Sequence, residues 1–205
     1  MINLLNPLLR KVAVLLTLAV ASTGFAASVG QPAPDFTLTD IDGNAVTLSS
    51  LKGKTVVLEW VNQECPFVVK HYDKSGNLPA LQKQALADGV VWLQINSAAA
   101  GKQGDYSEAK VKDWQKEHGV VAAHYFRDSD GKVGNLYAAK TTPHMYVINA
   151  EGTLVYNGAI DSIRSANPKD IDKADNYVTA ALAAVKAGTA VEKAVTVPYG
   201  CSVKY

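Results

Sequence analysis

The segment that most constrains the fold is an apolar run at residues 55–61, followed after a short interval by Cys65 and Pro66. The run is rich in β-branched and aromatic residues, and its nearly continuous apolar character is typical of a strand covered on both faces. Pro66 favours a helix start, because its ring fixes φ near the helical value and an N–H there would be unpaired anyway. The sequence therefore predicts strand, loop and helix, with Cys65 at the N-terminus of the helix.

Strands and helices alternate along most of the remaining chain, which predicts an α/β fold with a mixed sheet. The patterns predict two short extended pieces within residues 29–47, strands at 90–96 and 122–127, and a hairpin of 144–149 with 153–158. They predict helices at 66–72, 78–87, from Ser107 to about 118, at 133–139 and at 174–187, and a polar surface loop at 161–175.

The size and charge of the chain limit its function. Its 205 residues, 48% of them hydrophobic, fit one globular domain with a sizeable core. The formal net charge is +1, without a long block of one sign. Nucleic acid is therefore not an expected partner, because neutralising phosphates needs a concentrated basic face.

The N-terminus has the pattern of a secretory signal. Arg10 and Lys11 supply positive charge, residues 12–21 form an apolar run, and Gly24-Phe25-Ala26 offers small residues for cleavage. We expect residues 1–26 to be a signal peptide and residues 27–205 to be the exported, periplasmic domain, with no membrane insertion after cleavage. An uncleaved N-terminal anchor is the alternative, although the run is short for a membrane span.

Only two cysteines are present, Cys65 and Cys201, and 136 residues separate them. In an oxidising compartment they can form a structural disulfide, act as a redox pair or remain separate thiols. Cys65 is the candidate for reactivity, because the N-terminus of a helix favours negative charge and the thiolate is the nucleophile in disulfide exchange. The alternative is a cysteine that only packs beneath a loop.

A second feature is Thr142-Pro143-His144, which leads directly into the strand predicted at residues 144–149. Proline is unfavourable inside a sheet except at special positions. The Thr142–Pro143 bond at the mouth of a strand is therefore a candidate cis peptide. An ordinary loop proline is the alternative.

Four motifs in order resemble the redoxin (AhpC/TSA-like) branch of the thioredoxin superfamily, over residues 29–187. They are Val29-Gly-Gln-Pro-Ala-Pro-Asp-Phe-Thr-Leu38, Glu64-Cys65-Pro66-Phe67 after its strand, Thr142-Pro143-His144-Met-Tyr-Val-Ile-Asn149 and Gly152-Thr-Leu-Val-Tyr156. The resemblance implies a thioredoxin fold: a mixed central β-sheet with helices on both faces and an N-terminal extension. It further implies that Cys65 is the attacking thiol and that the groove for a partner is shaped by Pro66, Thr142, Pro143 and His144.

The chain departs from that family at Val68, which replaces the usual second cysteine. Residues 198–205, within a tail at 188–205, resemble the Gly-Cys-Ser-Val/Ile-Lys ending of a subgroup of exported redoxins. This resemblance makes Cys201 the candidate resolving thiol. The implied function is a periplasmic thiol–disulfide oxidoreductase that acts on protein thiols and disulfides, with no cofactor and no metal expected.

Two other functions stay open. A thiol peroxidase is one, because peroxide can oxidise any reactive thiolate; Leu58 and Asn62, however, stand where peroxiredoxins carry Pro and Thr or Ser. A non-catalytic redoxin is the other, with Cys65–Cys201 as a structural disulfide or with a metal held by these cysteines and His144. Three further residues could tune the thiol or could be solvated surface residues, namely Glu64, Lys70 and His71.

Overall fold

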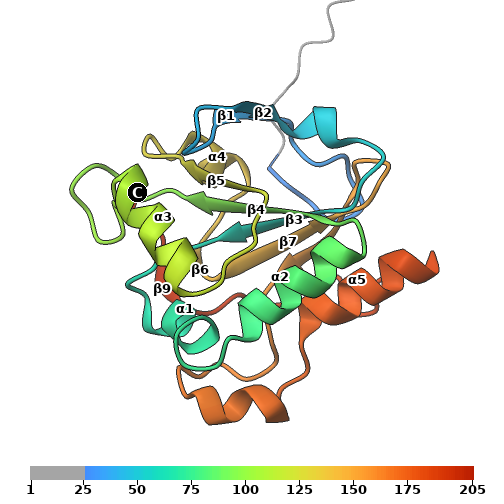
Figure 1. Cartoon of the computed structure of the whole chain (residues 1–205). Coiled ribbons are helices and arrows are strands. Elements are labelled where there is room, and N and C mark those ends of the chain that lie inside the picture. Colours follow the sequence, from blue (N-terminus) through green and yellow to red (C-terminus); the bar gives the residue numbers. More distant parts are fainter. Residues whose placement is uncertain (1–25) are drawn as a thin grey trace, which may run out of the picture.

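The computed structural model describes residues 26–205, and a five-stranded sheet forms its centre (Figure 1). The order of the strands is β5-β4-β3-β7-β8. β3, β4 and β5 run parallel, whereas β7 is antiparallel to β3 and β8 is antiparallel to β7. The bounds are β3 Val56–Trp60, β4 Val91–Asn96, β5 His124–Arg127, β7 His144–Ile148 and β8 Leu154–Gly158.

The central strand β3 is buried on both faces, as its apolar sequence predicts. Val57 and Val61 belong to one hydrophobic core, while Val56, Leu58 and Trp60 belong to a second core on the opposite face. Because successive side chains of a strand point to opposite faces, this single run supplies both cores.

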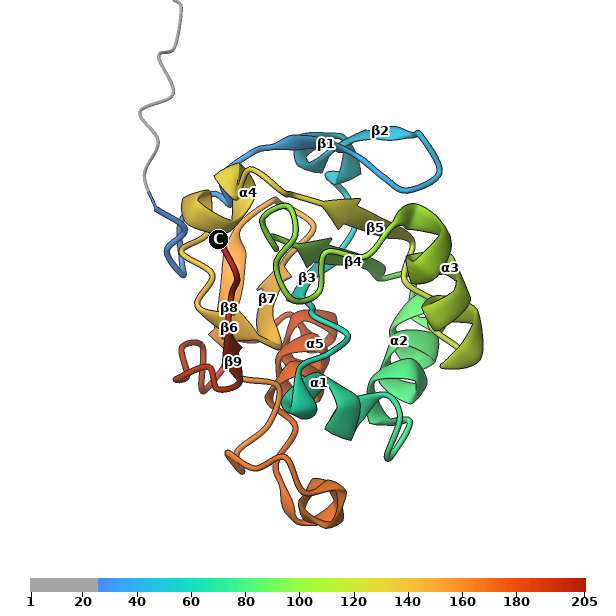
Figure 2. The ribbon, with the colours of Figure 1, turned by 90° about the vertical axis from the view of Figure 1, so that its left-hand side faces the viewer.

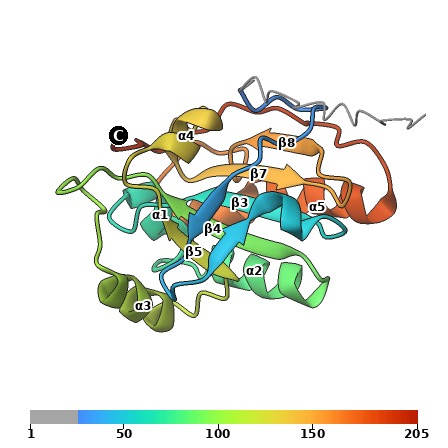
Figure 3. The same ribbon diagram turned by 90° about the horizontal axis from the view of Figure 1, so that it is seen from above.

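Helices cover one face of the sheet, and the other face carries a short hairpin and a short helix (Figures 1 and 3). The covering helices are α1 Pro66–His71, α2 Asn77–Ala87, α3 Glu108–Glu117 and α5 Tyr177–Ala187. The opposite face carries β1 Thr37–Thr39, β2 Ala45–Thr47, the 3₁₀ helix η1 Leu48–Leu51 and α4 Lys132–Leu136. This arrangement confirms the predicted thioredoxin fold, with its N-terminal extension and helices on both faces.

A second two-stranded sheet lies at the end of the sheet where β3 leads into α1. It consists of β6, Thr141–Thr142, and β9, Cys201–Ser202, which pair antiparallel. The chain end thus returns across the molecule and runs beside β6 toward α4 (Figure 2). Backbone hydrogen bonds from Val203 to Lys140 and from Ala99 to Lys204 hold this segment on both sides.

Several predicted boundaries need correction. The segment 161–175, predicted as a surface loop, contains a 3₁₀ helix, η2 Pro168–Lys173, and begins with the buried Asp161. α5 begins at Tyr177 rather than at 174, because the side chain of Asn176 caps it by accepting from the Thr179 N–H. α4 ends at Leu136 rather than 139, and Ala138 has a positive φ of 51°.

Two expectations concern the membrane. The predicted signal peptide at 1–26 falls, except for its last residue, outside the described part of the chain. Within residues 26–205, no helix is long and apolar enough to cross a membrane.

Candidate active site at Cys65

Cys65 lies where the sequence predicts it, at the N-cap of α1, after the loop that follows β3. The local structure follows from Pro66 at the first helical position and from hydrogen bonds of the Val68 and Val69 amides to the Cys65 carbonyl. The side chain is fully buried. Its sulfur makes no capping bond to α1 and instead donates to the Thr142 carbonyl oxygen at 3.0 Å.

The Thr142–Pro143 turn lies directly beside Cys65, and its peptide bond is cis, as predicted. Thr142 contributes its carbonyl to the contact with the thiol, while its buried hydroxyl has no partner among the described residues. Thr141 and Thr142 form β6, whose edge faces the C-terminal strand. The structure therefore brings together Cys65, Pro66, Thr142 and Pro143, four of the residues that the sequence singles out.

Cys201 reaches the same place from the far end of the chain. It lies opposite Thr142 in the β6–β9 pair, and its backbone N–H donates to the Cys65 sulfur at 3.4 Å. Both thiols are free. Burial raises the pKa of Cys201 to about 12, with further contributions from a hydrogen bond to Cys65 and the charge of that thiol. Cys201 is therefore protonated at neutral pH.

His144 follows the Thr142–Pro143 turn, and both of its ring nitrogens form hydrogen bonds. Its Nδ1 accepts from the Lys140 N–H at 3.2 Å, and its Nε2 lies 2.8 Å from the Asn157 side-chain oxygen, to which it donates. Burial lowers the pKa of His144 to about 4. The ring is therefore neutral and positions the segment that carries Thr142.

A buried ionic cluster lies beneath α1. Lys70 is fully buried and contacts Asp161 at 3.1 Å, while the Tyr199 hydroxyl donates to the same carboxylate. His71 is also fully buried, with Asn77 bonded to its Nδ1 and its Nε2 at 3.7 Å from Asp161. Burial and the charge of Lys70 lower the pKa of His71 to about 4. The expectation that Lys70 and His71 are solvated is thus wrong, whereas Glu64 is exposed.

A second buried cluster surrounds Glu59 on β3. Its carboxylate accepts from Tyr72 at 2.7 Å and Trp92 at 2.8 Å, and more weakly from Gln82 and Gln94. Burial raises the pKa of Glu59. The sequence patterns indicate no role for Glu59, Asp161 or Tyr199. A signal existed only for Glu59, an acidic residue inside an otherwise apolar strand.

The arrangement suits thiol chemistry better than metal binding. Two thiols meet beside a backbone edge that can pair with an extended chain, as β9 does. Within residues 26–205, no group of three His, Cys, Asp or Glu side chains is placed to hold a metal ion. The ring nitrogens of His144 are both engaged in hydrogen bonds, so the metal site considered with the two cysteines lacks a free imidazole.

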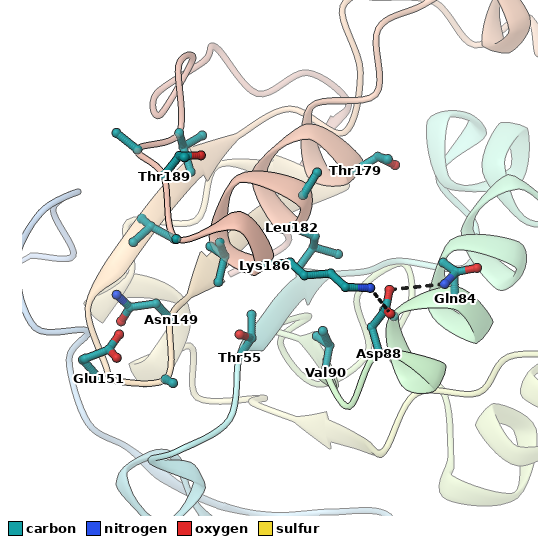
Figure 4. A pocket seen from close by; sticks show the side chains of 18 of the residues that line it. Thr55, Gln84, Asp88, Val90, Asn149, Glu151, Thr179, Leu182, Lys186 and Thr189 are labelled. Atoms are coloured by element: carbon teal, nitrogen blue, oxygen red, sulfur yellow. Dashed lines mark hydrogen bonds and ion pairs between the residues drawn. The ribbon is translucent and has the colours of Figure 1, made fainter.

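A large cavity lies elsewhere, between α2 and α5 at the opposite end of the sheet from Cys65 (Figure 4). It has a volume of about 740 Å³ and is lined mainly by apolar residues, among them Val90, Leu182 and Val185. An ion pair between Lys186 and Asp88 at 2.5 Å crosses its rim. No cysteine or histidine lines it.

Solved structures share this architecture. An uncharacterized conserved protein from Geobacillus kaustophilus aligns with a TM-score of 0.73 and 29% identity, over 87% of this chain and 92% of that one. A structure described as a thiol:disulfide interchange protein DsbE from Chlorobium tepidum aligns with a TM-score of 0.50 and 23% identity, over 64% of this chain and 85% of that one, which shows the fold alone. Sheet topology and these neighbours define a thioredoxin-fold protein.

Sequence comparisons give the family. The model of the AhpC/TSA family matches residues 29–157, more than half of the chain. The thiol-disulfide oxidoreductase ResA of Bacillus subtilis is 30% identical over 128 residues, which cover 62% of this chain and 65% of that protein. The chain belongs to the AhpC/TSA family.

Proposed function

We propose that this protein is a thiol–disulfide oxidoreductase in which Cys65 is the nucleophile and Cys201 the resolving thiol. The observation that carries the proposal is the 3.4 Å contact between the Cys201 amide and the Cys65 sulfur, which joins residues 136 positions apart. Relatives named as thiol-disulfide oxidoreductases support the same reaction class.

The proposed reaction transfers two electrons to a partner's disulfide. The Cys65 thiolate attacks one sulfur of that disulfide, forms a mixed disulfide and releases the partner's other sulfur as a thiolate. Cys201, after losing its proton to solvent, attacks the Cys65 sulfur and releases the partner's remaining thiol. The partner leaves reduced, and this chain holds a Cys65–Cys201 disulfide that an external dithiol must reduce. The reverse sequence oxidises a partner dithiol.

The decisive measurement is the reduction potential of the Cys65–Cys201 pair, obtained by equilibration with glutathione buffers and counting of alkylated thiols by mass spectrometry. We expect a two-electron transition at a potential above about −300 mV, because redox-active disulfides lie above the range of structural ones. A potential far below that value would indicate a structural disulfide instead. Failure of the two thiols to form a bond would contradict the resolving role of Cys201.

The Cys201→Ser variant sharpens the test. Without the resolving thiol, we expect the mixed disulfide between Cys65 and a disulfide-containing peptide to accumulate, and Cys65→Ser to form none. Stoichiometric loss of hydrogen peroxide with the reduced protein, faster than its exchange with the peptide disulfide, would favour the thiol peroxidase instead.

We further propose that residues 1–26 direct export to the periplasm and are removed, in keeping with chemistry that needs an oxidising compartment. The mass of the protein recovered from a periplasmic fraction tests this. A mature chain beginning at Ala27 is expected, and an intact N-terminus in the membrane fraction would indicate the anchor.

A further inference from the structure

The C-terminal segment 199–205, here called the tail strand, occupies the edge of the site as a ligand would. Its Cys201 lies opposite Thr142, so that β6 is paired along its length with the chain's own end. Beyond Cys201, the Val203 N–H donates to the Lys140 carbonyl at 3.1 Å, and the Tyr205 hydroxyl donates to Ala139 at 2.9 Å. A partner strand cannot pair with this edge of β6 until the tail strand leaves.

The first specific contact of the tail strand is made by Tyr199, two residues before Cys201. Its ring packs edge-on against Phe67 with centroids 5.7 Å apart, and its hydroxyl donates to Asp161. Lys70 lies 3.5 Å from the same hydroxyl. We call these three residues, Phe67, Lys70 and Asp161, the phenol subsite. It combines an aromatic wall with a buried ion pair that binds a hydroxyl group.

The second specific contact is made by Gly200. Its φ is 147°, and a Cβ on it would lie 2.1 Å from the Thr142 carbonyl oxygen and 2.7 Å from the Thr142 carbonyl carbon. Both atoms belong to the backbone beside Pro143, which cannot move aside as a flexible side chain can. Only glycine fits immediately before the cysteine that reaches Cys65.

We propose that the groove beside Cys65 is a binding site for an extended polypeptide with an aromatic hydroxyl residue, a glycine and then a cysteine, and that the tail strand is its built-in competitor. The proposal rests on the proposed function and specifies its substrate class. A partner would pair antiparallel with β6, place a tyrosine in the phenol subsite and place its cysteine against the Cys65 sulfur. The tail strand would leave the groove when the partner binds. It would then return, so that Cys201 can attack the Cys65 sulfur.

The test measures access to Cys65 in the full chain, with Cys201→Ser as the background so that only one thiol reacts. The readout is the rate of Cys65 alkylation by iodoacetamide, followed by mass spectrometry. Adding Gly200→Val should raise that rate at least about tenfold, because the valine side chain cannot dock and the tail strand opens more often. Val197→Ala is the matched control, since Val197 lies in the same tail and is 79% exposed; it should not change the rate.

The specificity is then tested in trans on the Gly200→Val, Cys201→Ser protein. A synthetic peptide with the sequence of residues 197–205, and serine in place of Cys201, should slow alkylation of Cys65 in a saturable manner. Peptides with leucine at the Tyr199 position or valine at the Gly200 position should protect much less. Equal protection by all three peptides, or no protection by any, would overturn the inference.

Two controls distinguish a failure of this inference from unfolding of the variant and from a failure of the proposed exchange reaction. Near-ultraviolet circular dichroism must show that Gly200→Val remains folded; if it does not, Tyr199→Leu, which disrupts the phenol subsite contact, takes its place. Alkylation needs no turnover, so a correct peptide preference without mixed-disulfide formation would leave the groove specificity intact and contradict only the proposed exchange reaction.

Discussion

Two ion pairs at opposite ends of the sheet have nearly the same chemistry but different surroundings. Lys70–Asp161 lies beneath the Cys65 site with side chains 0% and 4% exposed, whereas Lys186–Asp88 at the α2–α5 cavity is 70% and 31% exposed. Their N–O distances are 3.1 and 2.5 Å. The shorter pair is the weaker candidate for function, because water screens it, while the buried pair holds Tyr199 of the tail strand.

The same contrast applies to the cavities. The α2–α5 end has an open, mostly apolar cavity of about 740 Å³, whereas at the Cys65 end the chain's own β9 pairs with β6. Under the proposed function, the chemistry takes place away from this cavity. The proposed groove beside Cys65 is covered by a segment of the same chain.

Substitutions at the Cys65 end and at the α2–α5 end of the sheet should differ most in their effect on the rate of disulfide exchange. Replacing Cys65 by serine should reduce disulfide exchange by at least about a thousandfold, because no other group replaces an essential nucleophile. Lys186→Ala at the other end should leave the rate unchanged. Reduction of a fluorogenic peptide disulfide measures both. A comparable loss in Lys186→Ala would show that the α2–α5 end takes part in the reaction.

Stability should separate the two ion pairs next. Asp161→Asn leaves Lys70 buried without a counter-charge, and we expect a loss of about 3–5 kcal/mol in the free energy of unfolding. Urea denaturation followed by fluorescence measures it. A loss below 1 kcal/mol would mean that water reaches Lys70 and that the buried cluster is not rigid.

Acid should destabilise the protein through two buried histidines, His71 and His144. Folding holds the pKa of both His71 and His144 at about 4, below the ordinary 6.5, so the unfolded chain binds protons more strongly between these values. The contribution of the two neutral histidines to the free energy of unfolding is fully present above pH 6.5. It is lost as the pH falls toward 4, by about 3 kcal/mol for each histidine. Lys70 and Asp161 face His71, and Lys140 acts on His144.

The pH dependence is measured by urea denaturation between pH 4 and 7, where His144→Gln should show a shallower decline than the parent protein. Val197→Ala, at an exposed residue without a titratable group, provides the control and should follow the parent curve. An unchanged slope in His144→Gln would contradict the assignment of a neutral, buried imidazole.

The smallest effect is expected at the exposed pair. Lys186→Ala should change the free energy of unfolding less than Asp161→Asn does, and high salt should reduce the difference further. A double-mutant cycle with Asp88→Ala isolates the interaction energy. A coupling energy as large as the loss caused by Asp161→Asn would show that water does not screen the Lys186–Asp88 pair.

Local sequence determined the framework of this protein. The apolar run before Cys65, the proline after it and the Thr142–Pro143 pair were sufficient to predict β3, α1 and the cis peptide, because each depends on neighbouring residues. The motifs also identified the thioredoxin fold. The predicted helix ends were less accurate. At α5, for example, the start of the helix is set by the capping side chain of Asn176 and not by the spacing of apolar residues.

Only the tertiary structure decided what lies around the thiol. Contacts between segments distant in sequence bring the Cys201 amide to 3.4 Å from the Cys65 sulfur and Tyr199 to Asp161. Such contacts also bury Lys70 and His71. Periodicity encodes which face of a strand or helix is apolar, but it carries no information about the register in which a chain end pairs with a remote edge. That register depends on contacts such as the close approach of Gly200 to Thr142, which exist only once the chain has folded.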